Sequence, residues 1–168
     1  YLNFISIMKT SQIHTYKKNE KLRHHQKVLI DMILKSHGSN FKGNILDIGC
    51  ATGSLIRELR KKIKYSNFTG VDTSADLIKT AKSKSVSNCK FIKKDFIKIN
   101  KKYKFDLIIA AGVLAFYDDF SFALNKMINL LKKNGYLYII GTFNSENIDT
   151  LVKFRNNYTK SNWEKGLN

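Results

Sequence analysis

Residues 44–55, which read NILDIGCATGSL, constrain the fold more than any other part of the chain. Apolar residues lead into a carboxylate, Asp47, and then into a loop spaced by Gly49 and Gly53, after which a helical pattern begins. This pattern is typical of a buried strand that ends in a tight loop and opens a helix. In open α/β sheets such a loop lies at the carboxyl end of a strand, where ligands bind. We therefore expect a ligand site here.

The composition indicates one folded domain over residues 1–168. Hydrophobic residues make up 43% and aromatic residues 12% of the chain, which excludes a disordered protein. No apolar run approaches the roughly 18 residues that cross a bilayer, so we expect no membrane partner. Met8 resembles a natural start, and residues 1–7 are interpreted as an upstream extension or as the edge of a longer chain. Two cysteines, Cys50 and Cys89, cannot form a disulfide framework, and we expect an intracellular, cytoplasmic protein.

The formal net charge of +17 allows two interpretations. One is a nucleic acid or another acidic partner. The other is a composition bias, which two observations favour: the lysines are spread along the whole chain, and arginine, the usual phosphate-binding residue, occurs rarely. The arginines are Arg23, Arg57, Arg60 and Arg155.

Strand and helix patterns alternate along the chain. Apolar residues at helical spacing predict helices over 17–37, 54–64 and 120–131, and another that Thr73 or Ser74 caps. Apolar runs predict strands over 44–48, 67–71, 90–92, 105–111 and 136–141. The expected buried stripe of the first helix is Leu22, Val28, Leu29, Met32 and Ile33, and that of the last helix is Leu124, Met127 and Leu131. This order predicts an α/β fold with a doubly wound, mostly parallel sheet and helices on both faces.

The predicted core spans residues 40–143 and leaves a tail, 144–168, in which we find no strand pair. The fifth strand would then form an apolar sheet edge, which folded proteins normally cover. We expect the tail, a second copy of the chain in a homo-oligomer, or a longer native chain to cover it.

The carboxylate ahead of the glycine loop distinguishes two ligands. A dinucleotide site needs G-x-G-x-x-G to hold a diphosphate, whereas this loop reads G-x-x-x-G and carries Asp47 two residues before Gly49. A carboxylate repels a diphosphate and attracts a sulfonium and an amino group. The sequence therefore favours S-adenosylmethionine over NAD.

Two more carboxylates follow the next two predicted strands. Asp72 can accept hydrogen bonds from ribose hydroxyls, and the alternative is that it caps the next helix. Asp95 can accept from the adenine amine while Phe96 or Ile92 packs on the ring, and the alternative is that it pairs with nearby lysines. Carboxylates at three successive strand ends favour the ligand interpretation.

These motifs resemble, in family order, those of class I (Rossmann-like) S-adenosylmethionine-dependent methyltransferases of the small-molecule type. ILDIGCATGSL resembles the first motif, FTGVDTS the acidic second, CKFIKKDF the adenine segment and FDLIIAAGVLAFYDD the fourth. The resemblance implies that the backbone at Ala110 meets the methionine moiety, and that His14 and Tyr16 lie over the cofactor. The cofactor-binding residues expected in this way are Asp47, Gly49, Cys50, Ala51, Gly53, Asp72, Thr73, Asp95, Phe96, Ala110 and Tyr16.

The acceptor is not identified by these motifs. The fourth motif lacks the polar-Pro-Pro-aromatic box of enzymes that methylate base amines, and a small-molecule acceptor is favoured. The alternatives are a non-catalytic cofactor-binding or scaffold subunit and an RNA methyltransferase. No His/Cys cluster has metal-ligand spacing. Candidate bases, none assigned as catalytic, are His14, Tyr16, His24, His25, Tyr117, Asp118 and Asp119.

Overall fold

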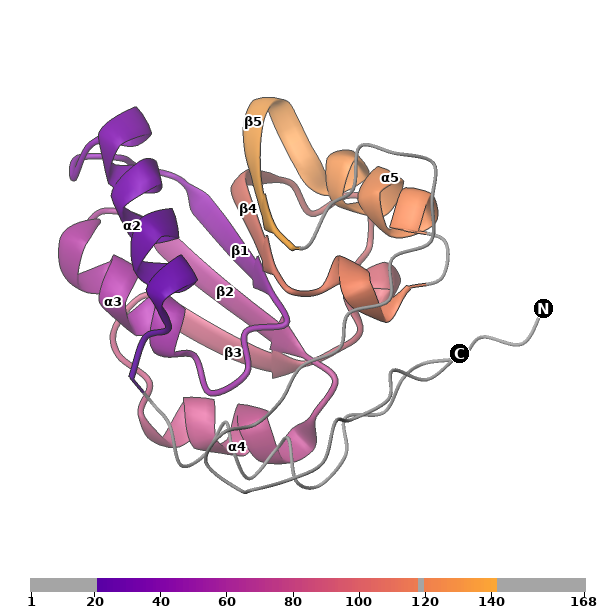
Figure 1. Ribbon diagram of the computed structural model, residues 1–168, viewed down its shortest axis with the longest axis horizontal. Helices are drawn as coiled ribbons and strands as arrows, with labels where there is room; N and C mark the ends of the chain where they lie inside the picture. The colour runs from indigo at the N-terminus through magenta and orange to yellow at the C-terminus, as the bar shows by residue number, and fades with distance from the viewer. Residues whose placement is uncertain (1–20, 118–119, 142–168) are drawn as a thin grey trace, which may run out of the picture.

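The computed structural model describes residues 21–117 and 120–141. Helices and strands alternate along most of this part of the chain (Figure 1). The elements are α2 (His24–His37), β1 (Asn44–Ile48), α3 (Ser54–Lys62), β2 (Asn67–Asp72), α4 (Ala75–Ser83), β3 (Cys89–Lys93), the 3-10 turn η1 (Phe96–Lys98), β4 (Phe105–Ala111), the 3-10 turn η2 (Leu114–Phe116), α5 (Phe120–Leu130) and β5 (Leu131–Ile140).

The five strands form one sheet in the order β3-β2-β1-β4-β5, and every pairing is parallel. The chain leaves β1 toward β2 on one side, and β4 pairs with β1 on the other side. The carboxyl end of β1 is therefore the point at which the strand order reverses, the usual ligand position in such sheets. The predicted doubly wound parallel fold is confirmed.

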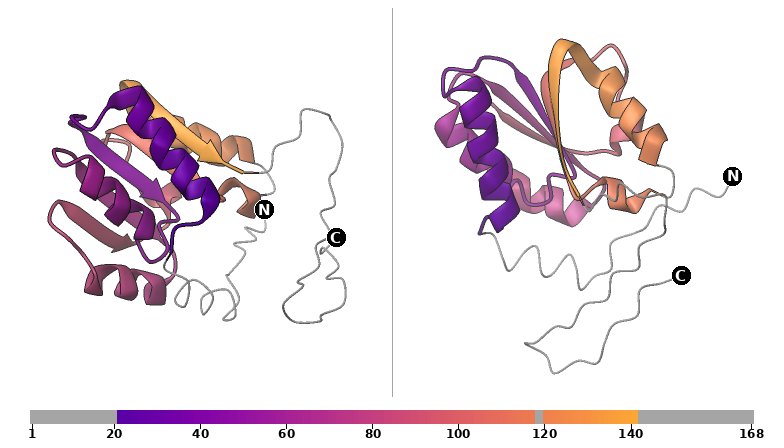
Figure 2. Two further views of the ribbon diagram at one scale, coloured as in Figure 1. Left: turned by 60° about the vertical axis from the view of Figure 1, so that its left-hand side comes forward. Right: turned by 45° about the horizontal axis from the view of Figure 1, so that its top comes forward.

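Helices cover both faces of the sheet. In the left view of Figure 2, α2, α3 and α4 lie in front of the sheet and α5 lies behind it. The first face buries residues of α2, α3 and α4 against Ile45, Leu107 and Ile109, whereas the second buries residues of α5 against Leu46 and Ile108. Successive residues of β1 and of β4 thus pack against helices on opposite faces of the sheet, because side chains alternate between the two faces along a strand.

Strand bounds were predicted better than helix faces. The strands at 44–48 and 105–111 have the predicted bounds. Residues 17–20 of the helix predicted over 17–37 lie outside the described part of the chain. Within the described residues this helix begins at His24, because Arg23 has extended backbone and its N–H donates to the Gln26 side chain at 3.0 Å. Its buried residues are Leu29, Ile30 and Ile33, and the predictions of Val28 and Met32 as core are wrong, since these are 44% and 53% exposed.

The last helix and strand also differ from the prediction. α5 ends at Leu130 and buries Ala123, Met127 and Leu130, whereas the predicted Leu124 is only half-buried. The last strand, predicted over 136–141, begins at Leu131 and ends at Ile140. Leu131 pairs with Phe105, and regular pairing resumes at Tyr136 after an irregularity. In the described residues β5 pairs with β4 alone, and the tail 144–168 lies outside them.

Candidate cofactor site

The glycine loop lies between β1 and α3 at the switch point of the sheet. Its first residues are anchored to the next strand: the N–H groups of Gly49 and Cys50 both donate to the carbonyl of Val71, at 2.9 and 3.1 Å. Within the loop, Gly53 N–H donates to the Cys50 carbonyl at 2.8 Å. These bonds fold the loop into a compact turn over the end of β2.

Glycine is required at both ends of this loop. Gly49 and Gly53 have φ of 69° and 76°, in the left-handed region that side chains with a Cβ rarely adopt. A Cβ on Gly49 would lie 2.9 Å from the Val113 side chain, and one on Gly53 would lie 2.5 Å from the Phe91 ring. The two glycines therefore allow the loop to pack against β3 and against the segment after β4.

Asp72 ties the end of β2 to the same loop. Its Oδ2 accepts from the Ala51 N–H at 2.9 Å, and its Oδ1 accepts from the Ser74 N–H at 2.8 Å. Ser74 is the residue that caps α4, through a 3.4 Å bond from Leu77 N–H. Burial raises the pKa of Asp72, although the backbone bonds from Ser74, Ala51 and Thr73 oppose this rise. The carboxylate thus organises the loop, and its oxygens have further lone pairs that can accept from a ligand.

Asp47 is buried beneath the loop, with only 2% of the residue exposed. Among the described residues its side chain has no hydrogen-bond or ion-pair partner. Burial, and secondarily the Asp72 carboxylate, raise the pKa of Asp47 to about 8. A buried carboxyl group without a partner is costly, and a cation placed beside it would offset that cost. This unpartnered group fits the positively charged methionine end of S-adenosylmethionine.

Cys50 fills space in the loop and is 5% exposed. Burial, together with the nearby Asp47 and Asp72 carboxylates, raises the pKa of its thiol. The thiol is therefore protonated and unreactive at neutral pH, which agrees with the interpretation of Cys50 as a small buried residue.

The residues predicted to contact adenine lie in β3 and directly after it. Asp95 accepts from the Ile97 N–H at 3.0 Å and caps η1, while Phe96 is 3% exposed and its ring meets the edge of Tyr117 at 5.9 Å between centroids. Ile92, the other apolar residue expected here, is half-buried. Burial and then Asp95 raise the pKa of Tyr117 to about 12, so this phenol is not a base at neutral pH.

Ala110 lies beside Ile48 at the ends of β4 and β1 and is fully buried. Its methyl group packs in the core on the α5 face, and only its backbone can meet a ligand. Thr73 is exposed after Asp72, and His24 and His25 are exposed at the start of α2. His14, Tyr16, Asp118 and Asp119 lie outside the described residues.

Three residues that shape the loop were missed by the sequence reasoning. Arg57 donates from Nη1 to the Thr52 carbonyl at 2.6 Å, Val113 limits the space above Gly49, and Gly70 leaves room for the Cys50 sulfur, which would be 2.8 Å from a Cβ there. Only Gly70 carried a sequence signal, as a glycine two residues before Asp72 in an otherwise apolar strand.

Two kinds of feature are absent from the described segments. No group of three or more His, Cys, Asp or Glu side chains there is arranged to hold a metal ion. Each helix in 21–117 and 120–141 is too short or too polar to cross a membrane.

The reversal of strand order at β1, the glycine loop and the buried carboxylates define a class I, Rossmann-like methyltransferase, the class that uses S-adenosylmethionine as methyl donor. The chain belongs to the family described as "Methyltransferase domain", whose model matches residues 40–166. The predicted family, fold and cofactor are thereby confirmed.

Curated relatives carry methyltransferase names. The chain is 29% identical over 123 residues to malonyl-acyl-carrier protein O-methyltransferase 1 of Ilyobacter polytropus, covering 72% of this chain and 45% of the relative. It is 33% identical over 96 residues to trans-aconitate 2-methyltransferase of an Enterobacter species, covering 57% and 38%. The chain thus spans half or less of the length of these relatives.

Solved structures show the same fold. The plantazolicin methyltransferase BpumL in complex with SAH superposes with a TM-score of 0.67 at 20% identity, covering 80% of this chain and 53% of that one. The N-methyltransferase NodS from Bradyrhizobium japonicum, in complex with S-adenosyl-L-homocysteine, gives 0.61 at 22% identity, covering 77% and 70%.

Proposed function

We propose that this chain transfers the methyl group of S-adenosylmethionine to a carboxylate oxygen of a small-molecule or carrier-bound acyl acceptor. The observation that carries the proposal is Asp47, which is buried beneath the glycine loop with Asp72 nearby and has no hydrogen-bond or ion-pair partner among the described residues. Asp47 is largely protonated at neutral pH before a ligand binds, and a cationic group placed beside it would favour its ionised form, whereas a diphosphate would oppose ionisation.

The order of the strands supports a set of proposed cofactor contacts. Asp47 would hold the α-amino group, Asp72 the ribose hydroxyls and Asp95 the adenine amine, in the order of β1, β2 and β3. The loop from Gly49 to Gly53, including Cys50 and Ala51, would pass over the methionine end, which the backbone of Ala110 closes from β4. Thr73, Phe96 and Tyr16 are proposed to complete the pocket. Bound cofactor supplies an activated methyl group, and the protein's part is to hold the acceptor in line with it.

The acceptor class rests on the names of the relatives and on the state of Tyr117. Malonyl and aconitate groups both carry carboxylates, and the relatives are named for methylating them. A carboxylate is already ionised at neutral pH and needs no base. An acceptor that needs no base agrees with the state of Tyr117, because its phenol, with a pKa of about 12, stays protonated at neutral pH.

The test is transfer of a labelled methyl group to three acceptors in parallel: a malonyl thioester, trans-aconitate and RNA. We expect label in the carboxylate acceptors and an alkali-labile product, as for a methyl ester. Label in RNA alone would replace the proposal with the nucleic-acid alternative. Cofactor binding without transfer to any acceptor would favour a binding or scaffold subunit.

A further inference from the structure

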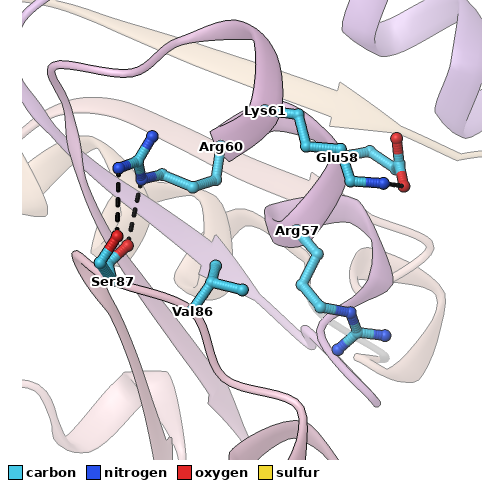
Figure 3. Close-up of a pocket in the computed structure, with 6 residues that line it drawn as sticks. All are labelled: Arg57, Glu58, Arg60, Lys61, Val86 and Ser87. Atoms are coloured by element: carbon cyan, nitrogen blue, oxygen red, sulfur yellow. Dashed lines mark hydrogen bonds and ion pairs between the residues drawn. The ribbon is translucent and has the colours of Figure 1, made fainter.

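A groove next to the glycine loop runs between α3 and the segment that leads into β3. Its volume is about 310 Å³. Figure 3 shows α3 supplying one wall and Val86 and Ser87 the other. The lining residues are Arg57, Glu58, Arg60, Lys61, Val86 and Ser87.

Both arginines of this groove are held in place by uncharged groups. Arg60 donates from Nε to the Ser87 carbonyl at 3.0 Å and from Nη2 to the Ser87 hydroxyl at 3.2 Å. Arg57 donates to the Thr52 carbonyl. Neither arginine forms an ion pair with a carboxylate in residues 21–117 or 120–141, whereas Lys61 pairs with Glu58. The groove therefore carries two oriented positive charges that no described acidic side chain neutralises.

The choice of arginine here is informative. The chain has 30 basic residues, almost all of them lysine, yet two of its few arginines lie three residues apart on α3. Residues at this spacing share a helix face. Lysine would supply the same charge, but only the planar guanidinium presents paired donors to a carboxylate or phosphate.

We propose that this groove docks an acidic segment of a protein partner, in which carboxylates reach Arg57 and Arg60. Val86, 43% exposed between them, would contact an apolar side chain of that segment. None of the described residues that line the groove is aromatic, although stacking on aromatic rings is a main contact for single-stranded nucleic acid. The lining thus favours a peptide over RNA. This proposal does not depend on the identity of the methyl acceptor.

The test measures binding of a fluorescent peptide in which leucine lies between glutamates that are spaced three and four residues apart. Binding is measured at low and at physiological salt. The full chain is compared with Arg60→Met, Arg60→Lys and Ser87→Ala. Lys101→Met is the charge-matched control, since Lys101 is exposed and does not line the groove. We expect Arg60→Met to weaken binding about tenfold, Arg60→Lys less, and the other two variants less than about twofold.

Two results would overturn the proposal. Equal losses for Arg60→Met and Lys101→Met would show attraction to the net charge alone. Tighter binding of oligouridylate, lost in Arg60→Met, would make the groove a nucleic-acid surface. Calorimetry with S-adenosylhomocysteine serves as the folding control, because Arg60 lies outside the cofactor loop and its replacement should leave cofactor affinity unchanged.

Discussion

The backbone N–H of Ala51 donates to Oδ2 of Asp72 at 2.9 Å, so that the glycine loop after β1 is tied to the carboxyl end of β2. Ala51 adopts a φ of 47°, an unusual value for a residue with a Cβ, and the bond to Asp72 helps to hold it there. One carboxylate thus shapes the loop that closes the pocket and also faces the proposed ribose position.

Replacing Asp72 with alanine is expected to weaken S-adenosylhomocysteine binding by at least tenfold, because the loop tether and the ribose acceptor are lost together. Calorimetry measures the affinity. Asp31→Ala is the control, since Asp31 is an exposed carboxylate on α2. An unchanged affinity in folded Asp72→Ala would remove Asp72 from the cofactor site.

The buried Asp47 should make stability depend on pH. Its pKa is about 8 in the folded chain against an ordinary 3.8, so between these values the folded state keeps a proton that the unfolded state has released. The free energy of unfolding therefore falls as pH rises from about 4 to about 8. Asp47→Asn should flatten this slope and raise the free energy of unfolding at pH 8 by roughly 1–3 kcal/mol.

Denaturant unfolding of the unmodified protein and of Asp47→Asn, from about pH 4 to about pH 8, measures how the free energy of unfolding of each depends on pH. If the two slopes coincide, Asp47 does not titrate with the raised pKa.

Cofactor binding should release a proton below pH 8. Below pH 8 the Asp47 carboxyl group is mostly protonated before the cofactor binds. A cationic amino group beside it favours the ionised carboxylate, so Asp47 must lose its proton when the cofactor binds. Affinity is expected to fall as pH falls from 8 to 6. Calorimetry at neutral pH in buffers of different ionisation enthalpy counts the proton, and Asp47→Asn should abolish the release. Equal heats in all buffers for the unmodified protein would contradict this.

Gly53 and Gly112 form a matched pair for testing the packing of the loop. Their φ values are 76° and 72°, but a Cβ on Gly53 would meet the Phe91 ring, whereas one on Gly112 would meet nothing within 4 Å. Gly112→Ala should cost only backbone strain, about 1–2 kcal/mol, and Gly53→Ala a further 1–3 kcal/mol from overpacking. Chemical denaturation compares the two. Equal costs would show that Phe91 moves aside freely.

The observed face of α2 can be tested with Ile30 and Met32. Ile30 is 2% exposed and Met32 is 53% exposed. Ile30→Ala should lower the free energy of unfolding by about 2–4 kcal/mol, and Met32→Ala by less than about 0.5 kcal/mol. The reverse order would restore the helix face predicted from the sequence.

The sequence by itself determined the strands and the residues at their ends. β1 and β4 are apolar runs buried on both faces, so their bounds are visible in local composition. Asp47 near the end of β1, Asp72 at the end of β2 and Asp95 after β3 are likewise visible from the strand patterns alone. The glycine loop was equally visible, since left-handed backbone and close packing leave glycine as the suitable residue at Gly49 and Gly53.

Tertiary structure decided how each element turns toward its neighbours. In α2, a stripe through Val28 and Met32 and one through Ile30 have similar helical spacing, and only contact with the sheet selects the second. The high pKa of Asp47 likewise arises from burial and from Asp72, a residue 25 positions away that β1–β2 pairing brings close. Arg57 acts on Thr52, and Phe91 on Gly53, through contacts that no local pattern encodes, because they depend on which segments the sheet places side by side.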